Sequence, residues 1–154
     1  MKKLFLTLAA GLLMLMAFQP SASAQSYQAF GAQEILGTWT FFVTIDGAPT
    51  CQCIVIARLR ADGTMDGPGN DQLSSAALGE WERTAYRQLK FALLQNNINP
   101  DGTAGGETVI RGTMNLNGTA DAGTGTSTFQ LLDVTGAVVS SGTATFQATK
   151  LKLD

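Results

Sequence analysis

The chain of 154 residues contains no histidine, and this absence limits the chemistry that its side chains can perform. Without an imidazole, the chain cannot form Ser-His or Cys-His nucleophile pairs, and it lacks the commonest zinc and copper ligand. The remaining candidates are two thiols, a group of acidic residues in a glycine-rich stretch, and a pair of neighbouring glutamates. We assign no catalytic residue, metal ion or cofactor from these residues.

The two thiols, Cys51 and Cys53, lie two residues apart in a stretch with the pattern of a β-strand, so they face the same way. Their Cα atoms would be roughly 6.5–6.8 Å apart, which is the upper limit for a disulfide. An oxidising compartment favours a bond within the pair or between chains. Two small buried hydrophobic residues fit the pattern equally well. The pair is therefore a disulfide candidate, with both interpretations open.

The acidic candidates are better explained as solvated surface groups. The glycine-rich stretch supplies Asp62, Asp66, Asn70 and Asp71. Their spacing does not match the twelve-residue calcium loop with its final glutamate, so we interpret them as turn residues. Glu80 and Glu82 share one face of a predicted strand on which Trp81 points inward, so we expect both carboxylates to face solvent.

The beginning of the chain is typical of an export signal. Lys2 and Lys3 precede an apolar run over residues 4–18, and small residues follow up to Ala24. The run is shorter than the roughly 20 residues that a membrane-spanning helix needs. We predict a leader over residues 1–24 that is cleaved after Ala24, a lead-in over residues 25–34 and one domain over residues 35–154. The protein would then be periplasmic or secreted, with no membrane anchor after cleavage.

The composition indicates an all-β domain with no affinity for polyanions. Outside the leader, eight basic and twelve acidic side chains remain, a net charge of −4. This balance disfavours nucleic acid and anionic lipid as partners. Charged residues make up only 14% of the chain, whereas Gly and Thr are abundant. Such a composition is typical of many short strands joined by tight turns.

Alternation of apolar and polar residues predicts the strands. From Ile35 to Ile45 it places Trp39, Phe41 and Val43 on one face. Similar stretches cover residues 51–60, 78–84, 86–95, 107–117, 124–133 and 138–149, with a short one near residues 64–66. Most are separated by short turns, so neighbours should pair antiparallel. Closure removes the two open edges of such a meander. We predict a single antiparallel up-and-down β-barrel of about eight strands, in preference to a sandwich.

A triplet near the start of the first strand carries a family resemblance. Gly37-Thr38-Trp39 resembles the Gly-x-Trp motif of lipocalin- and avidin-like barrels, and Gly79-Glu80-Trp81 repeats the triplet. The resemblance implies that Trp39 plugs one end of the barrel under a basic side chain, either Lys150 or Lys152. Lipocalins usually carry Arg there and a terminal helix, and this chain has neither. The allene oxide cyclase and dirigent barrels, also eight-stranded and rich in Gly and Thr, are the alternative resemblance.

The inward face of the predicted barrel combines large aromatic residues with small ones. Gly125, Ser140, Gly142, Ala144 and Ala148 would leave space. The residues that would line this space are Trp39, Phe41, Trp81, Arg87, Phe91, Ser127, Phe129 and Phe146. Eight strands give an interior that side chains either fill or leave just open for one ligand. Arg87 and Ser127 are included because buried polar groups need partners and often orient a ligand.

Three functions are compatible with this pattern. The leading hypothesis is an exported barrel that binds a small, largely apolar molecule in its interior. The second is an isomerase or cyclase of the allene oxide cyclase type, which a polar anchor inside the cavity would distinguish. The third is a filled barrel that serves as an interaction module of the cell envelope. An exposed apolar stripe of Phe42, Ile54 and Ile56 would support the third. The sequence leaves a homo-oligomer open.

Overall fold

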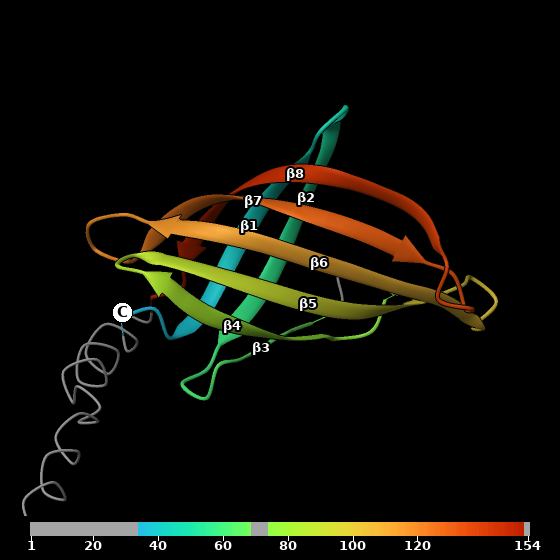
Figure 1. Ribbon diagram of the computed structural model, residues 1–154, viewed down its shortest axis with the longest axis horizontal. Coiled ribbons are helices and arrows are strands. Elements are labelled where there is room, and N and C mark those ends of the chain that lie inside the picture. Colours follow the sequence, from blue (N-terminus) through green and yellow to red (C-terminus); the bar gives the residue numbers. More distant parts are fainter. Residues whose placement is uncertain (1–33, 69–73, 153–154) are drawn as a thin grey trace, which may run out of the picture.

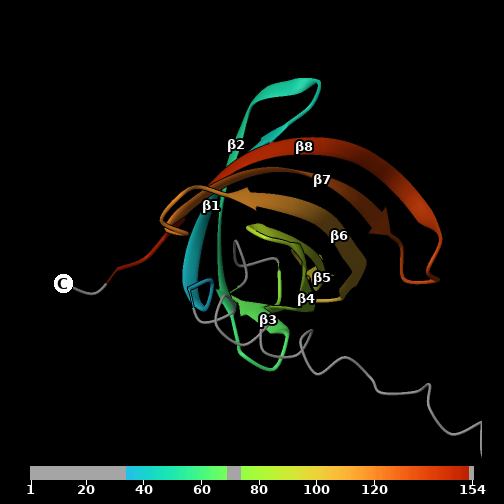
Figure 2. The ribbon, with the colours of Figure 1, turned by 60° about the vertical axis from the view of Figure 1, so that its left-hand side comes forward.

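The protein forms a closed barrel of eight antiparallel strands, in which each strand pairs with its neighbours in the sequence and the last pairs with the first. The computed structural model describes residues 34–68 and 74–152, without the side chains of residues 49–52. Figure 1 shows the strands along the barrel, and Figure 2 shows them surrounding the interior. The strands are β1 (Gly37–Ile45), β2 (Ala48–Leu59), β3 (Thr64–Gly67), β4 (Ala77–Ala85), β5 (Gln88–Ile98), β6 (Ala104–Leu116), β7 (Ala122–Leu132) and β8 (Val138–Lys150). The predicted fold class, including the short strand near residue 64, is confirmed.

Aspartates fix several of the turns that the sequence marks. Asp62, Asp101 and Asp133 each accept hydrogen bonds from the backbone N–H and the hydroxyl of the threonine two residues later. The glycine in each of these turns has a φ of 83°, which a residue without a Cβ adopts at no steric cost. The local sequence therefore determines where the chain reverses.

The two ends of the barrel differ in how they are covered. We call the end at which β1 begins and β8 ends the closed end, and the opposite end the open end. The turns between β2 and β3, β4 and β5, and β6 and β7 lie at the closed end, and the last two are on the left of Figure 1. Most inward-facing residues near the closed end are buried, whereas several of those near the open end are partly exposed.

The wall of the barrel is uneven around its circumference. β7 and β8 pair along nearly their whole length, but β2 and β3 pair at only two positions, Arg58 with Asp66 and Leu59 with Met65. The remainder of β2 continues with β1 as a hairpin that crosses the other strands steeply (Figure 1). The outer face of this hairpin therefore lies beside the outer faces of β7 and β8.

Candidate functional site

Trp39 is buried near the end of the barrel at which β1 begins, where it was predicted to lie. Its side chain is 0% exposed, and its indole Nε1 donates a hydrogen bond of 2.9 Å to the carbonyl oxygen of Ile35. Lys150 is its partner on β8, and the Lys150 Nζ donates to the Glu34 carbonyl oxygen at 2.8 Å. Lys152 instead pairs with Asp121 at 2.7 Å. Of the two basic candidates, Lys150 is thus the one placed beside Trp39, where its ammonium binds a backbone carbonyl.

Three phenylalanines from different strands meet in the middle of the barrel. The ring centroids of Phe41 and Phe146 are 5.4 Å apart, and that of Phe91 lies 6.1 and 5.9 Å from them. The tilted, edge-on geometry is the favourable one for aromatic pairs. All three were predicted to line the interior, and the barrel brings them together from β1, β5 and β8. They divide the closed end from the open end.

Glycines on the inward face are covered by aromatic rings on the neighbouring strand. Gly112 lies opposite Phe91, and a Cβ added to this glycine would come within 2.5 Å of the ring. Gly125 likewise lies opposite Phe146, and a Cβ added to this glycine would clash with the Phe146 ring. At the third such pair, a Cβ on Gly142 would lie 2.6 Å from the ring of Phe129. Space that the small residues leave is therefore occupied by rings from across the strand pair.

Apolar side chains near the open end are packed against the core on one side only. Val43, Val55 and Ile110 are partly buried and contact the core cluster. Phe129 and Ser127, two of the predicted lining residues, are partly exposed on β7. The buried side chain of Gln95 donates to the Ser75 carbonyl oxygen at 3.2 Å, so its amide N–H already has a partner.

The two remaining predicted lining residues are Trp81, the partner of Phe91 across β4 and β5, and Arg87 in the turn after β4. Trp81 is 8% exposed, and its Nε1 donates to the Arg60 carbonyl oxygen at 3.0 Å. Arg87 occupies the turn between β4 and β5 at the closed end, with a φ of 61°. Its guanidinium lies 4.9 Å from the centroid of the Tyr86 ring, and its buried Nε has no hydrogen-bond partner in the described part of the chain. The barrel thus separates Arg87 from Ser127 and Phe129.

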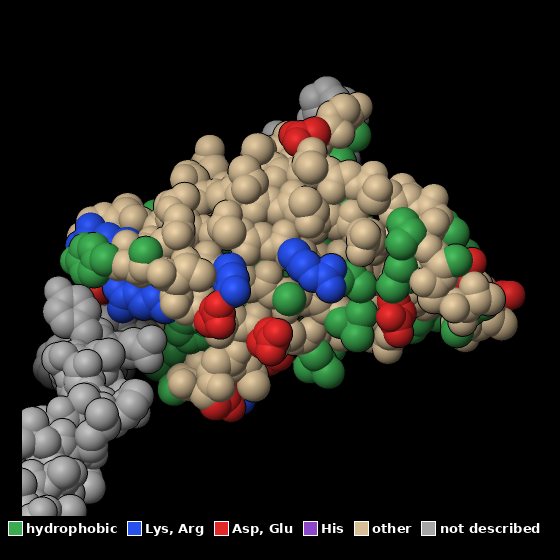
Figure 3. Space-filling model, viewed as in Figure 1, with side chains coloured by type: hydrophobic (Ala, Val, Ile, Leu, Met, Phe, Trp, Pro, Cys, Tyr) green, Lys and Arg blue, Asp and Glu red, His purple; other side chains and the backbone are tan. Residues whose placement is uncertain are grey.

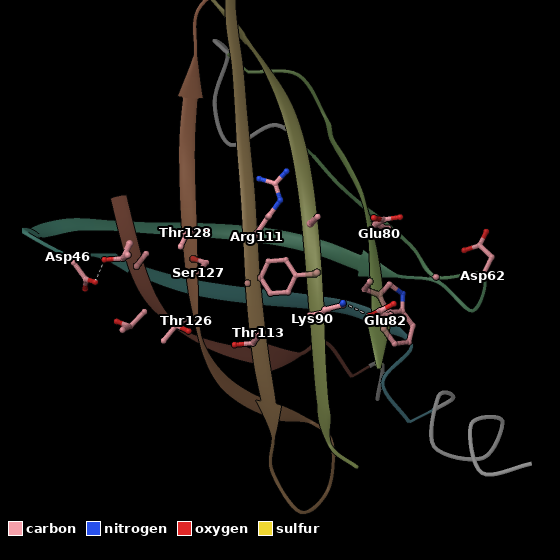
Figure 4. Close-up of a pocket in the computed structure, with 18 residues that line it drawn as sticks. Asp46, Asp62, Glu80, Glu82, Lys90, Arg111, Thr113, Thr126, Ser127 and Thr128 are labelled. Atoms are coloured by element: carbon pink, nitrogen blue, oxygen red, sulfur yellow. Dashed lines mark hydrogen bonds and ion pairs between the residues drawn. The ribbon is translucent and has the colours of Figure 1, made fainter. Parts of the chain in front are cut away.

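An open hollow crosses the outer face of the barrel. It has a volume of about 950 Å³ and runs over β4, β5, β6, β7 and β8. Figure 4 shows Asp46 and Asp62 at opposite ends of it. Its charged residues also include Glu80 and Glu82, with Lys90 bonded to Glu82 at 2.5 Å. Arg111 lies on the same surface, without a carboxylate partner in the described part.

A second hollow, of about 730 Å³, adjoins the first and shares Thr126 and Thr145 with it. Its lining contains no charged residue: Phe42, Val43, Thr44, Ile54, Asn115, Thr124, Gly125, Thr126, Thr145, Phe146 and Gln147. We call this second hollow the outer trough. Figure 3 shows mainly uncharged polar surface over β7 and β8, with charged side chains gathered over the strands below them. The sequence reasoning identified Phe42 and Ile54, but it missed the threonines, whose signal was the Thr-x-Thr spacing of two adjacent strands.

The apolar stripe of the interaction hypothesis is present on the outer surface. Phe42, Ile54 and Ile56 are 51%, 58% and 42% exposed. Phe42 and Ile54 are direct partners across β1 and β2, and both line the outer trough. Side chains opposite one another on two strands lie close enough to form one continuous surface.

Hydrogen bonds and ion pairs lower the pKa of several surface carboxyls. The pKa of Asp121 lies far below its ordinary value of 3.8, because Lys152, Thr119 and Asn117 all bond to its carboxylate. The pKa of Asp66 is lowered chiefly by its hydrogen bond from Arg60. The pKa of Asp62 is lowered by the hydroxyl and N–H of Thr64. The hydrogen bonds that cause these shifts stabilise the turns at Asp62 and Asp121 and the pairing of Asp66 with Arg60.

The remaining chemical candidates of the sequence lie partly outside the described residues. This is the case for the Cys51 side chain, and so for the candidate disulfide with Cys53, and for Asn70 and Asp71 of the acidic stretch. Within the described ranges, no three potential metal ligands gather, and no helix is long and apolar enough to cross a membrane. Residues 1–33, which contain the predicted leader and most of the lead-in, are also outside these ranges.

Comparison with known proteins does not extend these observations. No protein-family model, no curated protein and no solved structure matches the chain.

Proposed function

We propose that the protein is an exported binding module that holds its partner on the outer face of β1, β2, β7 and β8. The observation that carries this proposal is the Phe42–Ile54 pair, two large apolar side chains more than half exposed beside one another in an uncharged hollow. Exposed apolar surface costs free energy in water at about 25 cal/mol per Å², and a contiguous patch commonly marks a binding site. The leader-like start supports export.

The filled middle of the barrel supports this use of the outer surface. Phe41, Phe91 and Phe146 are in mutual contact there. Rings also cover Gly112 and Gly125. A small eight-stranded barrel either fills its interior with side chains or holds one small ligand. The described packing favours the filled alternative for the middle of the barrel.

A second candidate function is the binding of a small, largely apolar molecule at the open end. It is favoured by the partial exposure of inward-facing Val43, Val55 and Ile110 at that end. Such a ligand would lie above the phenylalanines, with Phe129 and Ser127 beside it. The position of Trp39 beside Lys150 supports kinship with the lipocalin- and avidin-like barrels, many of which bind ligands within the barrel.

One fluorescence experiment separates the two candidates. Nile red, a neutral apolar dye, is titrated into the purified protein and into the variants Phe42→Ala and Ala144→Leu. Binding on the outer face predicts that Phe42→Ala weakens dye binding while Ala144→Leu retains it. Binding at the open end predicts the reverse, since Ala144 faces inward on β8.

A matched control is Leu94→Ala, which shortens another exposed apolar side chain, on β5 and outside both hollows. The control should bind the dye like the wild type. Equal weakening in Phe42→Ala and Leu94→Ala would contradict the proposed function, because the dye would then report general surface hydrophobicity.

A further inference from the structure

Two rows of side chains lie in register across four strands, along the outer trough and, at Thr113, the edge of the adjoining hollow. Pairing of β1 with β8, β8 with β7 and β7 with β6 aligns one row of hydroxyls: Thr44, Thr145, Thr126 and Thr113. The same pairing aligns the second row, two residues along each strand: Phe42, Gln147, Thr124 and Asn115. Neighbouring strands are about 4.8 Å apart, and residues two apart on one strand are separated by roughly 6.6 Å. The rows therefore form a regular strip perpendicular to the strands.

Three hydrogen-bonding side chains of this strip are available to a ligand, whereas Asn115 already accepts a hydrogen bond from Gln88. Within residues 34–68 and 74–152, the side chains of Thr126, Thr145 and Gln147 have no protein hydrogen-bond partner. Hydroxyls and amides both donate and accept hydrogen bonds. The hydroxyls and the amide of the strip therefore match a ligand whose own polar groups also donate and accept hydrogen bonds. An apolar molecule would leave this half of the trough unsatisfied.

Charge excludes ionic ligands from the same surface. The outer trough has no charged lining residue. The adjoining hollow carries four carboxylates, on Asp46, Asp62, Glu80 and Glu82, against the cations of Lys90 and Arg111. A polyanion would be repelled by this excess of negative charge. A polycation would find its nearest carboxylates outside the trough.

The lining of the outer trough suits a hydroxyl-rich ligand better than it suits a protein partner. Threonine is under-represented among the residues that dominate protein–protein binding energies, which are enriched in Trp, Tyr and Arg. The trough contains several exposed threonines and, at one edge, the apolar pair of Phe42 and Ile54. Sugar rings combine hydroxyl groups at their rim with C–H faces that pack on apolar side chains.

We propose that the outer trough binds a neutral polysaccharide chain, which lies across β1, β8, β7 and β6. Sugar hydroxyls exchange hydrogen bonds with Thr126, Thr145 and Gln147, while Phe42 packs against the C–H face of one ring. This inference rests on the proposed function, because it uses the same outer face.

Affinity electrophoresis tests the inference with the purified protein. Native gels contain hydroxyethylcellulose, starch, xyloglucan or dextran as neutral polymers, and alginate as an acidic one. We expect at least one neutral polymer to retard the wild-type protein and alginate to leave its mobility unchanged. Phe42→Ala and Thr126→Val should each weaken binding by roughly three- to tenfold, the effect of losing one packing or hydrogen-bonding partner.

The matched control is Thr149→Val, because Thr149 is also exposed on the outer face of β8 but lies outside both hollows. It should bind like the wild type. Thr145→Val provides a second trough variant if circular dichroism shows that Thr126→Val is not folded. No retardation in any of the four neutral gels, retardation by alginate alone, or equal weakening in Thr149→Val would each overturn the inference. Loss of dye binding in Phe42→Ala without polysaccharide binding would remove the inference and leave the proposed function standing.

Discussion

The closed and open ends of the barrel are built from the same alternating pattern but differ in what covers them. At the closed end, Ile35 and Trp39 are buried, and the indole N–H of Trp39 is bonded to the backbone carbonyl of Ile35. Near the open end, Val43, Val55 and Ile110 contact the core on one side and are partly exposed on the other. The difference indicates that the closed end supplies most of the stability, because fully buried side chains lose the most contact with water.

The largest expected effect is therefore at the closed end. Trp39→Ala empties a fully buried aromatic site and should lower the free energy of unfolding by about 3–5 kcal/mol. Chemical denaturation of the variant and of Phe129→Ala, which shortens a partly exposed aromatic residue nearer the open end, measures the contrast. A loss below about 1 kcal/mol for Trp39→Ala, the level of ordinary surface changes, would mean that Trp39 does not plug the barrel.

The second-largest expected effect on stability concerns the packed layer between the two ends of the barrel. Ala144 is 3% exposed on the inward face of β8, two residues from Phe146 on the open-end side. Ala144→Leu adds three carbon atoms to this packed layer and should destabilise the protein by about 1–3 kcal/mol. Thermal melts of the variant and the wild type measure the change. An unchanged melting temperature would show that empty space exists beside Ala144. It would then favour binding of a ligand within the barrel over binding on its outer face.

The smallest expected effect is a change in the pH dependence of stability at the closed end. The carboxylate of Asp121, in the turn between β6 and β7, has a lowered pKa because Lys152, Thr119 and Asn117 bond to it. A lowered pKa in the folded state contributes stability above the ordinary value of 3.8, and this contribution declines as the pH falls below that value.

Asp121→Asn keeps the shape of the side chain but removes its charge. Melting temperatures of the wild type and the variant should differ most at neutral pH and converge progressively below about pH 4. Glu80→Gln is the control, since Glu80 is an exposed carboxylate on the outer face of β4. A difference between wild type and Asp121→Asn that is independent of pH would contradict this account of the turn.

Local sequence determined the strands, the turns and the two faces of each strand. The alternation from Ile35 to Ile45 predicts a strand with Trp39 and Phe41 inward, and both are buried. The Asp-Gly steps at Asp62 and Asp101 predict reversals, and in both turns the aspartate accepts a hydrogen bond from the backbone N–H two residues later. These features follow from interactions between residues only a few positions apart, so the sequence is sufficient to predict them.

Only the tertiary structure decided whether the small inward residues leave a cavity. The sequence shows Gly125 and Gly142 as space, but strand register places a phenylalanine ring over each of them, and another over Gly112. Register also aligned Thr44, Thr145 and Thr126 of the outer trough into one row, and Arg87 is placed at the closed end by the turn between β4 and β5. Which residues face each other across strands depends on pairing between distant segments. The alternation along a single strand predicts which residues face inward, but it does not predict which side chains from other strands pack against them.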